Sequence, residues 1–297
     1  MAFIDPQALA RVSRMELVAR DAVEGFLSGR HPSPYYGSSV EYADHRPYSV
    51  GDEIRSLDWK LLAKTDKYYV KLFEEQTNLR CTILVDASAS MGFGGDGRDR
   101  MTKLQYAAHL AAALAYLMLR QNDAVGLGMY DRQLRHHLPS RSTAVHFRRM
   151  IELLEAAEPR SDSNAAAAMH ELASRLKRRG LVIIISDFLD DLEAIMDALG
   201  HFRYRKHEVI AFHVMDPDEL AFPYERLTRF RDAESSSMVV ANPATIRKRY
   251  LDRLNQFIKA LRGGCLQRDV SYELARTDTD WERMLSAYLG RRSRITA

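Results

Sequence analysis

The chain has 297 residues, of which 46% are hydrophobic and 28% are charged, and its formal net charge is +3. This composition supplies a substantial apolar core and excludes a disordered or fibrous protein. The basic clusters are short and are separated by acidic stretches, so we interpret them as solvated surface rather than as a nucleic-acid-binding stripe. The two cysteines, Cys81 and Cys265, have neither metal-site nor disulfide spacing and are expected to be buried, reduced thiols.

No targeting or membrane segment is visible in the sequence. Residues 1–6 lack a basic region followed by a long apolar stretch, which a secretory signal requires. The longest apolar run, residues 104–119, is shorter than the roughly 20 residues that a membrane-spanning helix needs. We therefore expect a cytoplasmic protein without a membrane span.

The first part of the chain, residues 1–78, differs in pattern from the rest. It contains one expected helix near residues 14–27, a turn-rich stretch at 31–37 and an alternating stretch at 67–73 that is typical of a strand. We interpret residues 1–78 as an extension that packs on a larger domain of residues 79–297.

From residue 80 onward, short apolar runs alternate with longer helical segments, which is typical of β–α units and a parallel sheet. The expected strands are residues 81–85, 123–130, 133–138 as an edge strand stopped by Pro139, 181–185, 208–215 and 270–274. The expected helices are residues 103–120, 143–157, 165–178, 192–203, 244–261 and 280–289. Residues 216–242 are expected to be irregular, with a short hairpin. The fold class is therefore α/β, a doubly wound and mostly parallel sheet flanked by helices.

A candidate metal site follows the first of these strands. Asp86 ends the strand, and Ser88 and Ser90 supply two hydroxyls at alternate positions in the next loop. Open parallel sheets bind ligands beyond the carboxyl ends of their strands, where the strand order reverses, and Asp187 ends a second such strand. If the two strands are neighbours, Asp187 reaches the same ion, and the 161–164 loop adds a third hydroxyl. Oxygen ligands without sulfur or imidazole favour Mg²⁺ or Mn²⁺ over Ca²⁺, which usually takes more carboxylates.

Simpler interpretations of these residues remain open. Asp86 and Ser88 are also typical caps for a helix that follows a strand. The stretch from 46 to 59 is either a folded connector, which we favour because Pro47 and Gly51 form turns, or a surface that contacts a partner.

The Asp-x-Ser-x-Ser stretch resembles the metal-ion-dependent adhesion site of von Willebrand factor type A domains. A wider pattern, over about residues 20–215, resembles the bacterial family called domain of unknown function 58. The stretches that carry this wider resemblance are Arg46-Pro47-Tyr48-Ser49-Val50-Gly51-Asp52, Asp58-Trp59, Tyr69-Val70-Lys71, Phe73-Glu74-Glu75 and Ile185-Ser186-Asp187-Phe188.

The resemblance implies a von Willebrand factor type A-like, Rossmann-like fold and one metal ion. The implied ligands are Asp86, Ser88 and Ser90, with Asp187 binding directly or through water. Ser163 and Asn164 stand where the family has a Thr-Asp pair, so Ser163 keeps the hydroxyl but the carboxylate is lost. Members of the family are usually encoded beside MoxR-type AAA+ ATPases, which implies an adaptor that works with such an ATPase in the maturation of client proteins.

Three functions compete at this point. The leading hypothesis is a protein-binding module, not an enzyme, whose metal ion binds a carboxylate of the partner. The alternative is a metal-dependent hydrolase acting on phosphate esters, but the sequence has no phosphate-binding Gly-rich loop, no Gly-x-Ser-x-Gly motif and no histidine placed as a base. A nucleic-acid binder is suggested only by the pI of 8.8 and the arginines near the C-terminus.

Overall fold

The computed structural model describes residues 15–17, 19–20, 23, 44–48, 59, 61–62, 68–72, 79–94, 100–160, 163–231 and 237–279. The chain divides into two compact units, residues 1–31 together with 79–297, and residues 32–78. In the smaller unit, β1 (Asp44–Pro47) pairs antiparallel with β2 (Tyr69–Leu72), and the Tyr48 N–H continues the ladder by donating to the Tyr68 carbonyl at 3.0 Å.

The larger unit is built on a six-stranded sheet in the order β10-β7-β6-β3-β4-β5. Its strands are β3 (Arg80–Asp86), β4 (Ala124–Tyr130), β5 (Leu134–Arg141), β6 (Leu181–Ser186), β7 (Glu208–Met215) and β10 (Ser271–Arg276). Neighbouring strands are parallel except for β5, which runs antiparallel to β4 at one edge. The chain winds outward from β3 in one direction and then from β6 in the other, so the strand order reverses between β3 and β6.

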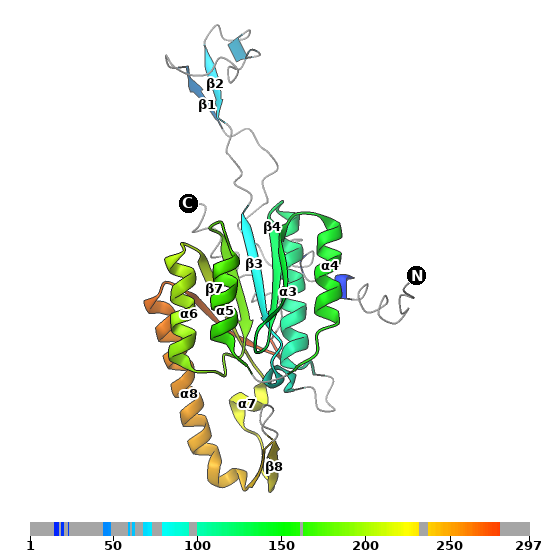
Figure 1. Ribbon diagram of the computed structural model, residues 1–297, viewed down its shortest axis with the longest axis vertical. Coiled ribbons are helices and arrows are strands. Elements are labelled where there is room, and N and C mark those ends of the chain that lie inside the picture. The colour runs from blue at the N-terminus through cyan, green and yellow to red at the C-terminus, as the bar shows by residue number, and fades with distance from the viewer. Residues whose placement is uncertain are drawn as a thin grey trace, which may run out of the picture. The chain divides into compact units, whose positions relative to one another are not determined.

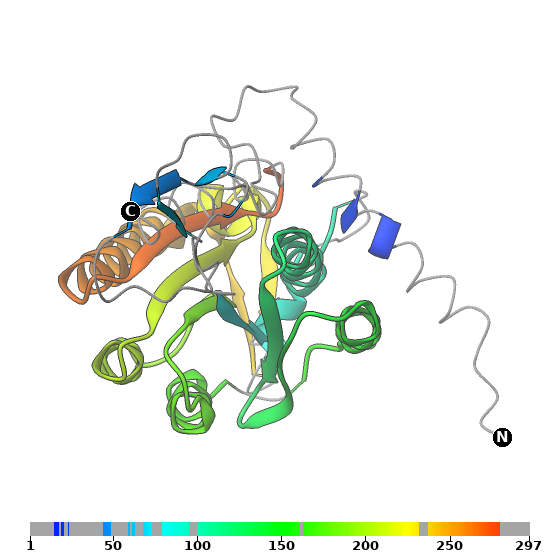
Figure 2. The same ribbon diagram turned by 90° about the horizontal axis from the view of Figure 1, so that it is seen from above.

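Helices cover both faces of this sheet (Figures 1 and 2). The helices α3 (Lys103–Arg120) and α4 (Ala144–Glu155) pack on one face. The helices α5 (Ala165–Arg175), α6 (Leu192–Tyr204) and α8 (Pro243–Gln267) pack on the other. Because successive side chains of a strand point to opposite faces, Ile83 and Val85 join the first core and Leu84 joins the second. Burial on both faces explains the continuous apolar runs of the central strands.

Further short elements follow the carboxyl ends of the strands. They are the 3-10 helix η2 (Ala89–Gly92), the helix α7 (Pro217–Ala221) and the hairpin of β8 (Thr228–Arg231) and β9 (Met238–Ala241). Aromatic rings connect the hairpin to α8. Phe222 stacks on Phe230 with ring centroids 5.6 Å apart and makes a tilted contact with Tyr250 of α8 at 4.7 Å. In Figure 1 the first turns of α8 extend with this hairpin beyond the sheet.

The predicted fold class is confirmed, and most predicted elements lie within a few residues of the observed ones. The described part of the predicted N-terminal helix is helical, and Met15, Ala19 and Val23 are buried in the core shared with α3 and α4. The predicted stretches at 31–37 and 280–289 lie outside the described residues. So do Ser161 and Asp162 of the loop before α5. The N-terminal helix thus belongs to the larger unit, whereas the packing of residues 32–78 on that unit stays a prediction.

Some element boundaries were predicted wrongly. Strand β5 does not stop at Pro139 but continues to Arg141, because the irregularity in its pairing with β4 falls between the Leu127–Leu138 and Val125–Arg141 pairs. A proline without an N–H is tolerated at such a bulge on an edge strand. Helix α5 ends at Arg175 rather than at residue 178, α8 continues to Gln267, and α7 lies in a stretch predicted to be irregular.

Candidate metal site at the carboxyl edge of the sheet

Four adjacent parallel strands each end in a buried carboxylate. Asp86 is the last residue of β3, and Asp131, Asp187 and Asp216 follow β4, β6 and β7 directly. Each of the four is at most 1% exposed. An ionised carboxylate is costly to bury without a counter-charge, so the partners of each decide what this edge can do.

The two outer carboxylates have arginine partners. Asp131 accepts a hydrogen bond from Nε of Arg135. Asp216 lies 3.7 Å from Nη1 of Arg100 and also accepts a hydrogen bond of 3.1 Å from the Thr277 hydroxyl. Both carboxylates are therefore neutralised from within the chain.

Asp187 has a buried lysine as its partner. Nζ of Lys103 donates to Oδ2 of Asp187 at 2.7 Å and to Oε1 of Glu219 at 2.8 Å, and the lysine side chain is fully buried. Burial lowers the pKa of Lys103, but the charges of Asp187 and Glu219 outweigh burial, so the net shift of the pKa is upward. The other carboxylate oxygen of Asp187 accepts from the Leu189 N–H at 3.3 Å. Each carboxylate oxygen of Asp187 thus has a fixed donor, and one of the two donors is a cation.

Asp86 differs from these three. Its Oδ1 accepts the Ser88 N–H at 2.9 Å, and its Oδ2 accepts the hydroxyls of Tyr130 at 3.0 Å and Ser186 at 2.6 Å. Within the described part of the chain, no lysine, arginine or histidine forms an ion pair with it. Burial and then the nearby charge of Asp187 raise the pKa of Asp86 to about 6. This carboxylate is buried among neutral donors, and no counter-cation for it lies in the part of the chain that the structure describes.

Two hydroxyls stand beside Asp86. Ser88 is buried and Ser90 is half-buried, and their Oγ atoms lie 3.1 Å apart. Adjacent oxygen ligands of an octahedral Mg²⁺ ion, with bonds of about 2.0–2.1 Å, are separated by about 2.9 Å. The spacing of the two hydroxyls, and the oxygen chemistry of both hydroxyls and of Asp86, therefore fit a small divalent cation.

The loop before α5 is tied to the same edge at both ends. The Arg160 N–H donates to the Ala87 carbonyl at 2.9 Å, and the Asn164 N–H donates to the Asp131 carbonyl at 3.1 Å. The Asn164 side chain accepts a hydrogen bond from the first turn of α5, so it acts as the helix N-cap. Ser163 lies half-buried between these two attachments.

The structure therefore joins Asp86, Ser88 and Ser90 in one hydrogen-bonded group, and the charge of Asp187 acts on Asp86. It holds Ser163 in a loop attached to Ala87. Binding of a metal by this set stays a prediction. Among the residues that the structure describes, no group of three or more His, Cys, Asp or Glu side chains is arranged to hold an ion, so the protein ligands here would be one carboxylate and hydroxyls.

Sequence reasoning missed the polar partners of the two carboxylates. Lys103 and Glu219 were not singled out, and neither was Tyr130. One signal for Lys103 was available. A lysine at the first position of a helix is unfavourable beside the positive end of the helix dipole, so its presence there indicates a nearby carboxylate. The spacing in sequence gave no indication of which carboxylate.

The strand order and the position of the Asp86 loop where that order reverses define a doubly wound α/β domain of the von Willebrand factor type A-like class. The model of the family described as "Protein of unknown function DUF58" matches residues 44–256, more than half of the chain. The chain belongs to this family, as its motifs had indicated. Uncharacterized proteins of Mycobacterium bovis (Mb1516) and Mycobacterium tuberculosis (Rv1480) are 29% identical to it over 235 residues, which cover 78% of this chain and 72% of each of theirs.

Three solved structures are similar at low sequence identity. An aerotolerance-related membrane protein of Bacteroides fragilis matches with a TM-score of 0.47 and 17% identity, over 71% of this chain and 97% of its own. The conserved hypothetical protein BatB of Bacteroides thetaiotaomicron matches with a TM-score of 0.48 and 17% identity, over 73% and 99%. The SpRpn10 VWA domain matches with a TM-score of 0.39 and 11% identity, over 70% and 94%.

The predicted cytoplasmic location is corrected by these comparisons. The first of the three structures is described as a membrane protein, which contradicts the assignment, so we withdraw it. The absence of a targeting pattern near residue 1 was too weak a basis for a location. None of the helices described in the structure has the length and apolar character needed to cross a membrane.

Proposed function

We propose that this chain is a protein-interaction module that holds one divalent cation, Mg²⁺ or Mn²⁺, at Asp86, Ser88 and Ser90, and that the ion binds a carboxylate of a partner protein. The observation that supports the proposal is the contrast among the strand-end carboxylates. Three of them have a lysine or arginine partner, whereas Asp86 is buried with neutral donors alone among the described residues.

The ligand set leaves room for a partner. One carboxylate and two hydroxyls fill three of the six positions that Mg²⁺ prefers, and water or an incoming carboxylate completes the rest. Ca²⁺ fits less well, because it usually takes more carboxylate ligands. Asp187 contributes through water in this proposal, since Lys103 already holds its Oδ2 atom. Ser163 is the candidate for a further hydroxyl.

The role of the chain's own residues is electrostatic positioning. The Ser88 N–H and the Tyr130 and Ser186 hydroxyls fix the Asp86 carboxylate, so no reorganisation is needed when a cation arrives. The buried negative charge of Asp86 supplies the attraction, and it is strengthened by the low polarity of the site. A bound ion would present its open positions to a partner's acidic side chain, which gives directional binding.

The partner in this proposal is a MoxR-type AAA+ ATPase, together with a client protein that contacts the metal through a carboxylate. The family resemblance supports the ATPase. The test is co-purification of a MoxR-type ATPase from the same organism with the wild-type protein in Mg²⁺, with the wild-type protein in EDTA, and with an Asp86→Ala variant. Association that is unchanged by EDTA and by the substitution would contradict a metal-dependent contact.

Metal binding is tested directly by isothermal titration of Mn²⁺ into the purified chain. Asp86→Ala should abolish binding, while Asp197→Ala, which removes an exposed carboxylate, should leave it unchanged. Near-UV circular dichroism of both variants shows whether the fold is intact. Wild-type affinity for Mn²⁺ in a folded Asp86→Ala protein would refute the site.

We propose no catalytic role for this edge. A metal-dependent hydrolase acting on phosphate esters makes the opposite prediction. Metal-stimulated hydrolysis of p-nitrophenyl phosphate that is lost in Asp86→Asn would favour the hydrolase over the interaction module.

A further inference from the structure

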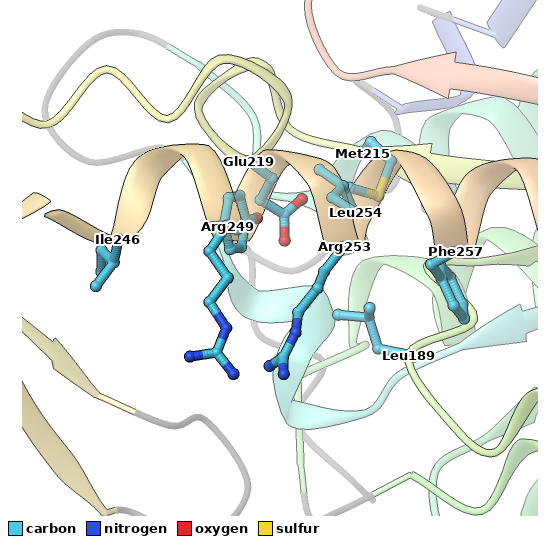
Figure 3. A pocket seen from close by; sticks show the side chains of 9 residues that line it. Leu189, Met215, Glu219, Ile246, Arg249, Arg253, Leu254 and Phe257 are labelled. Carbon is cyan, nitrogen blue, oxygen red and sulfur yellow. The ribbon is translucent and has the colours of Figure 1, made fainter. Parts of the chain in front are cut away.

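An open groove of about 550 Å³ lies along the first half of α8, beside the Asp187 loop. Its apolar lining comes from three places in the chain, Leu189 after β6, Met215 at the end of β7, and the α8 side chains Ile246, Leu254 and Phe257. Figure 3 shows these side chains together with Glu219 of α7. The groove therefore combines a strand-end loop with one face of a long helix.

The α8 residues of the groove recur at helical spacing. Ile246, Tyr250, Leu254 and Phe257 are half-buried and lie on one stripe of the helix. From Leu261 onward the same helix is buried against the core, at Leu261 and Cys265. The first half of this stripe thus has apolar character without the full burial of the second half.

Two arginines line the groove beside this apolar stripe. Arg249 and Arg253 are exposed and one helical turn apart, and Figure 3 shows their side chains extending from α8 in the same direction. Neither forms an ion pair within the described ranges of the chain. Glu219, the acidic residue of the groove lining, accepts a hydrogen bond from Lys103. The surface offered by the groove is therefore apolar and cationic.

We propose that this groove binds an acidic, amphipathic peptide segment of a partner protein, with apolar side chains against Leu189 and Phe257 and carboxylates on Arg249 and Arg253. Charge complementarity selects the acidic partner, because arginine binds carboxylates in a paired, bidentate geometry. The length of the apolar stripe on α8 favours a peptide segment as the occupant. The stripe from Ile246 to Phe257 spans roughly 16 Å of helix, which equals about five residues of extended chain.

This inference rests on the proposed function, since it gives the interaction module a second contact, but the groove needs no metal ion. The two contacts are joined structurally through Glu219. The Glu219 side chain lines the groove and accepts a hydrogen bond from Lys103, and the same lysine donates a hydrogen bond to Asp187. A partner could occupy both the groove and the metal edge at once.

The probe is a fluorescein-labelled ten-residue peptide of alternating glutamate and leucine, and the measurement is fluorescence anisotropy with the full chain in EDTA. Arg249→Glu/Arg253→Glu should weaken binding at least tenfold. The matched control is Lys259→Glu/Arg262→Glu, which makes the same charge change at two exposed positions of α8 outside the groove. The control should stay within twofold of the wild type.

A charge-swapped probe sharpens the test. A peptide of alternating lysine and leucine should bind the wild type poorly and should bind Arg249→Glu/Arg253→Glu better than the wild type. Arg249→Gln/Arg253→Gln serves if the glutamate variant does not fold, and it should also weaken the acidic probe.

Three results would overturn the proposal. The first is an equal loss in the groove variant and the control, which indicates general attraction to a basic helix. The second is displacement of the probe by decanoate at concentrations where an unlabelled acidic peptide fails, which indicates a lipid. The third is no binding to the wild type. Because the assay contains no metal, a failure of Mn²⁺ binding at Asp86 leaves this result unaffected, and the two proposals fail separately.

Discussion

Asp86 and Asp187 end adjacent parallel strands, are equally buried, and yet stand in opposite chemical surroundings. Asp187 receives the Lys103 ammonium and a backbone N–H, which only donate hydrogen bonds. Asp86 receives one backbone N–H and the hydroxyls of Tyr130 and Ser186, which can also accept. The comparison teaches that burial of a carboxylate does not define a cation site. In our proposal the distinguishing feature is that Asp86 lacks a lysine, arginine or histidine partner among the described residues.

The largest expected effect comes from removing the internal cation. Lys103→Met should lower the free energy of unfolding by about 3–5 kcal/mol, because it leaves Asp187 and Glu219 buried without their shared partner. Urea denaturation of the metal-free protein measures this change. A loss below about 1 kcal/mol would show that the lysine is not the partner that holds Asp187.

The next effect comes from Asp187→Asn, which should destabilise the metal-free protein by about 2–3 kcal/mol. The amide has one acceptor oxygen, so its NH₂ group must face either Lys103 or the Leu189 N–H, both of which are donors. The same urea titration applies, and a double-mutant cycle with Lys103→Met measures the coupling between the two side chains.

Asp86→Asn should change the free energy of unfolding in the opposite direction and stabilise the metal-free protein. It removes a buried charge that has no cationic partner among the described residues, and the Tyr130 and Ser186 hydroxyls can turn to accept from the amide. We expect the metal-free protein to gain about 1–2 kcal/mol, and Mn²⁺ to stabilise only the wild type. Thermal melting with EDTA and with Mn²⁺ measures both. Destabilisation equal to that of Asp187→Asn would remove the distinction between the two carboxylates.

The same carboxylate should also give the metal-free protein a pH dependence. The pKa of Asp86 is raised from its ordinary 3.8 to about 6, so the folded protein binds a proton that the unfolded chain has released. The wild type therefore loses stability relative to Asp86→Asn as the pH rises from about 4 to 6, by about 1 kcal/mol per pH unit at most, and the difference stays constant above. Urea denaturation of both proteins in EDTA at pH 4.5, 5.5 and 7 checks this. If the stability advantage of Asp86→Asn over the wild type shrinks as the pH rises, the raised pKa of the buried Asp86 carboxylate is contradicted.

The sequence determined the sheet and the position of its polar edge. Continuous apolar runs such as residues 181–185 need burial on both faces, and the carboxylates that follow them mark where the strands stop. The sequence predicted that Asp86 and Asp187 would lie at one edge if their strands were neighbours, and the structure shows that β3 and β6 are neighbours. The end of β5 depends on a pairing irregularity, and the end of α8 on packing of Leu261 and Cys265 in the core, and neither appears in a local pattern.

Only the tertiary structure decided which carboxylate is neutralised and which is not. Lys103 and Asp187 are 84 residues apart and Lys103 and Glu219 are 116 apart, so no local spacing connects them. The groove of α8 has the same origin, because its lining comes from the ends of two strands and from a helix that follows them. Periodicity is read from neighbours in sequence, whereas the pairing of buried charges depends on which distant segments the folded sheet brings together.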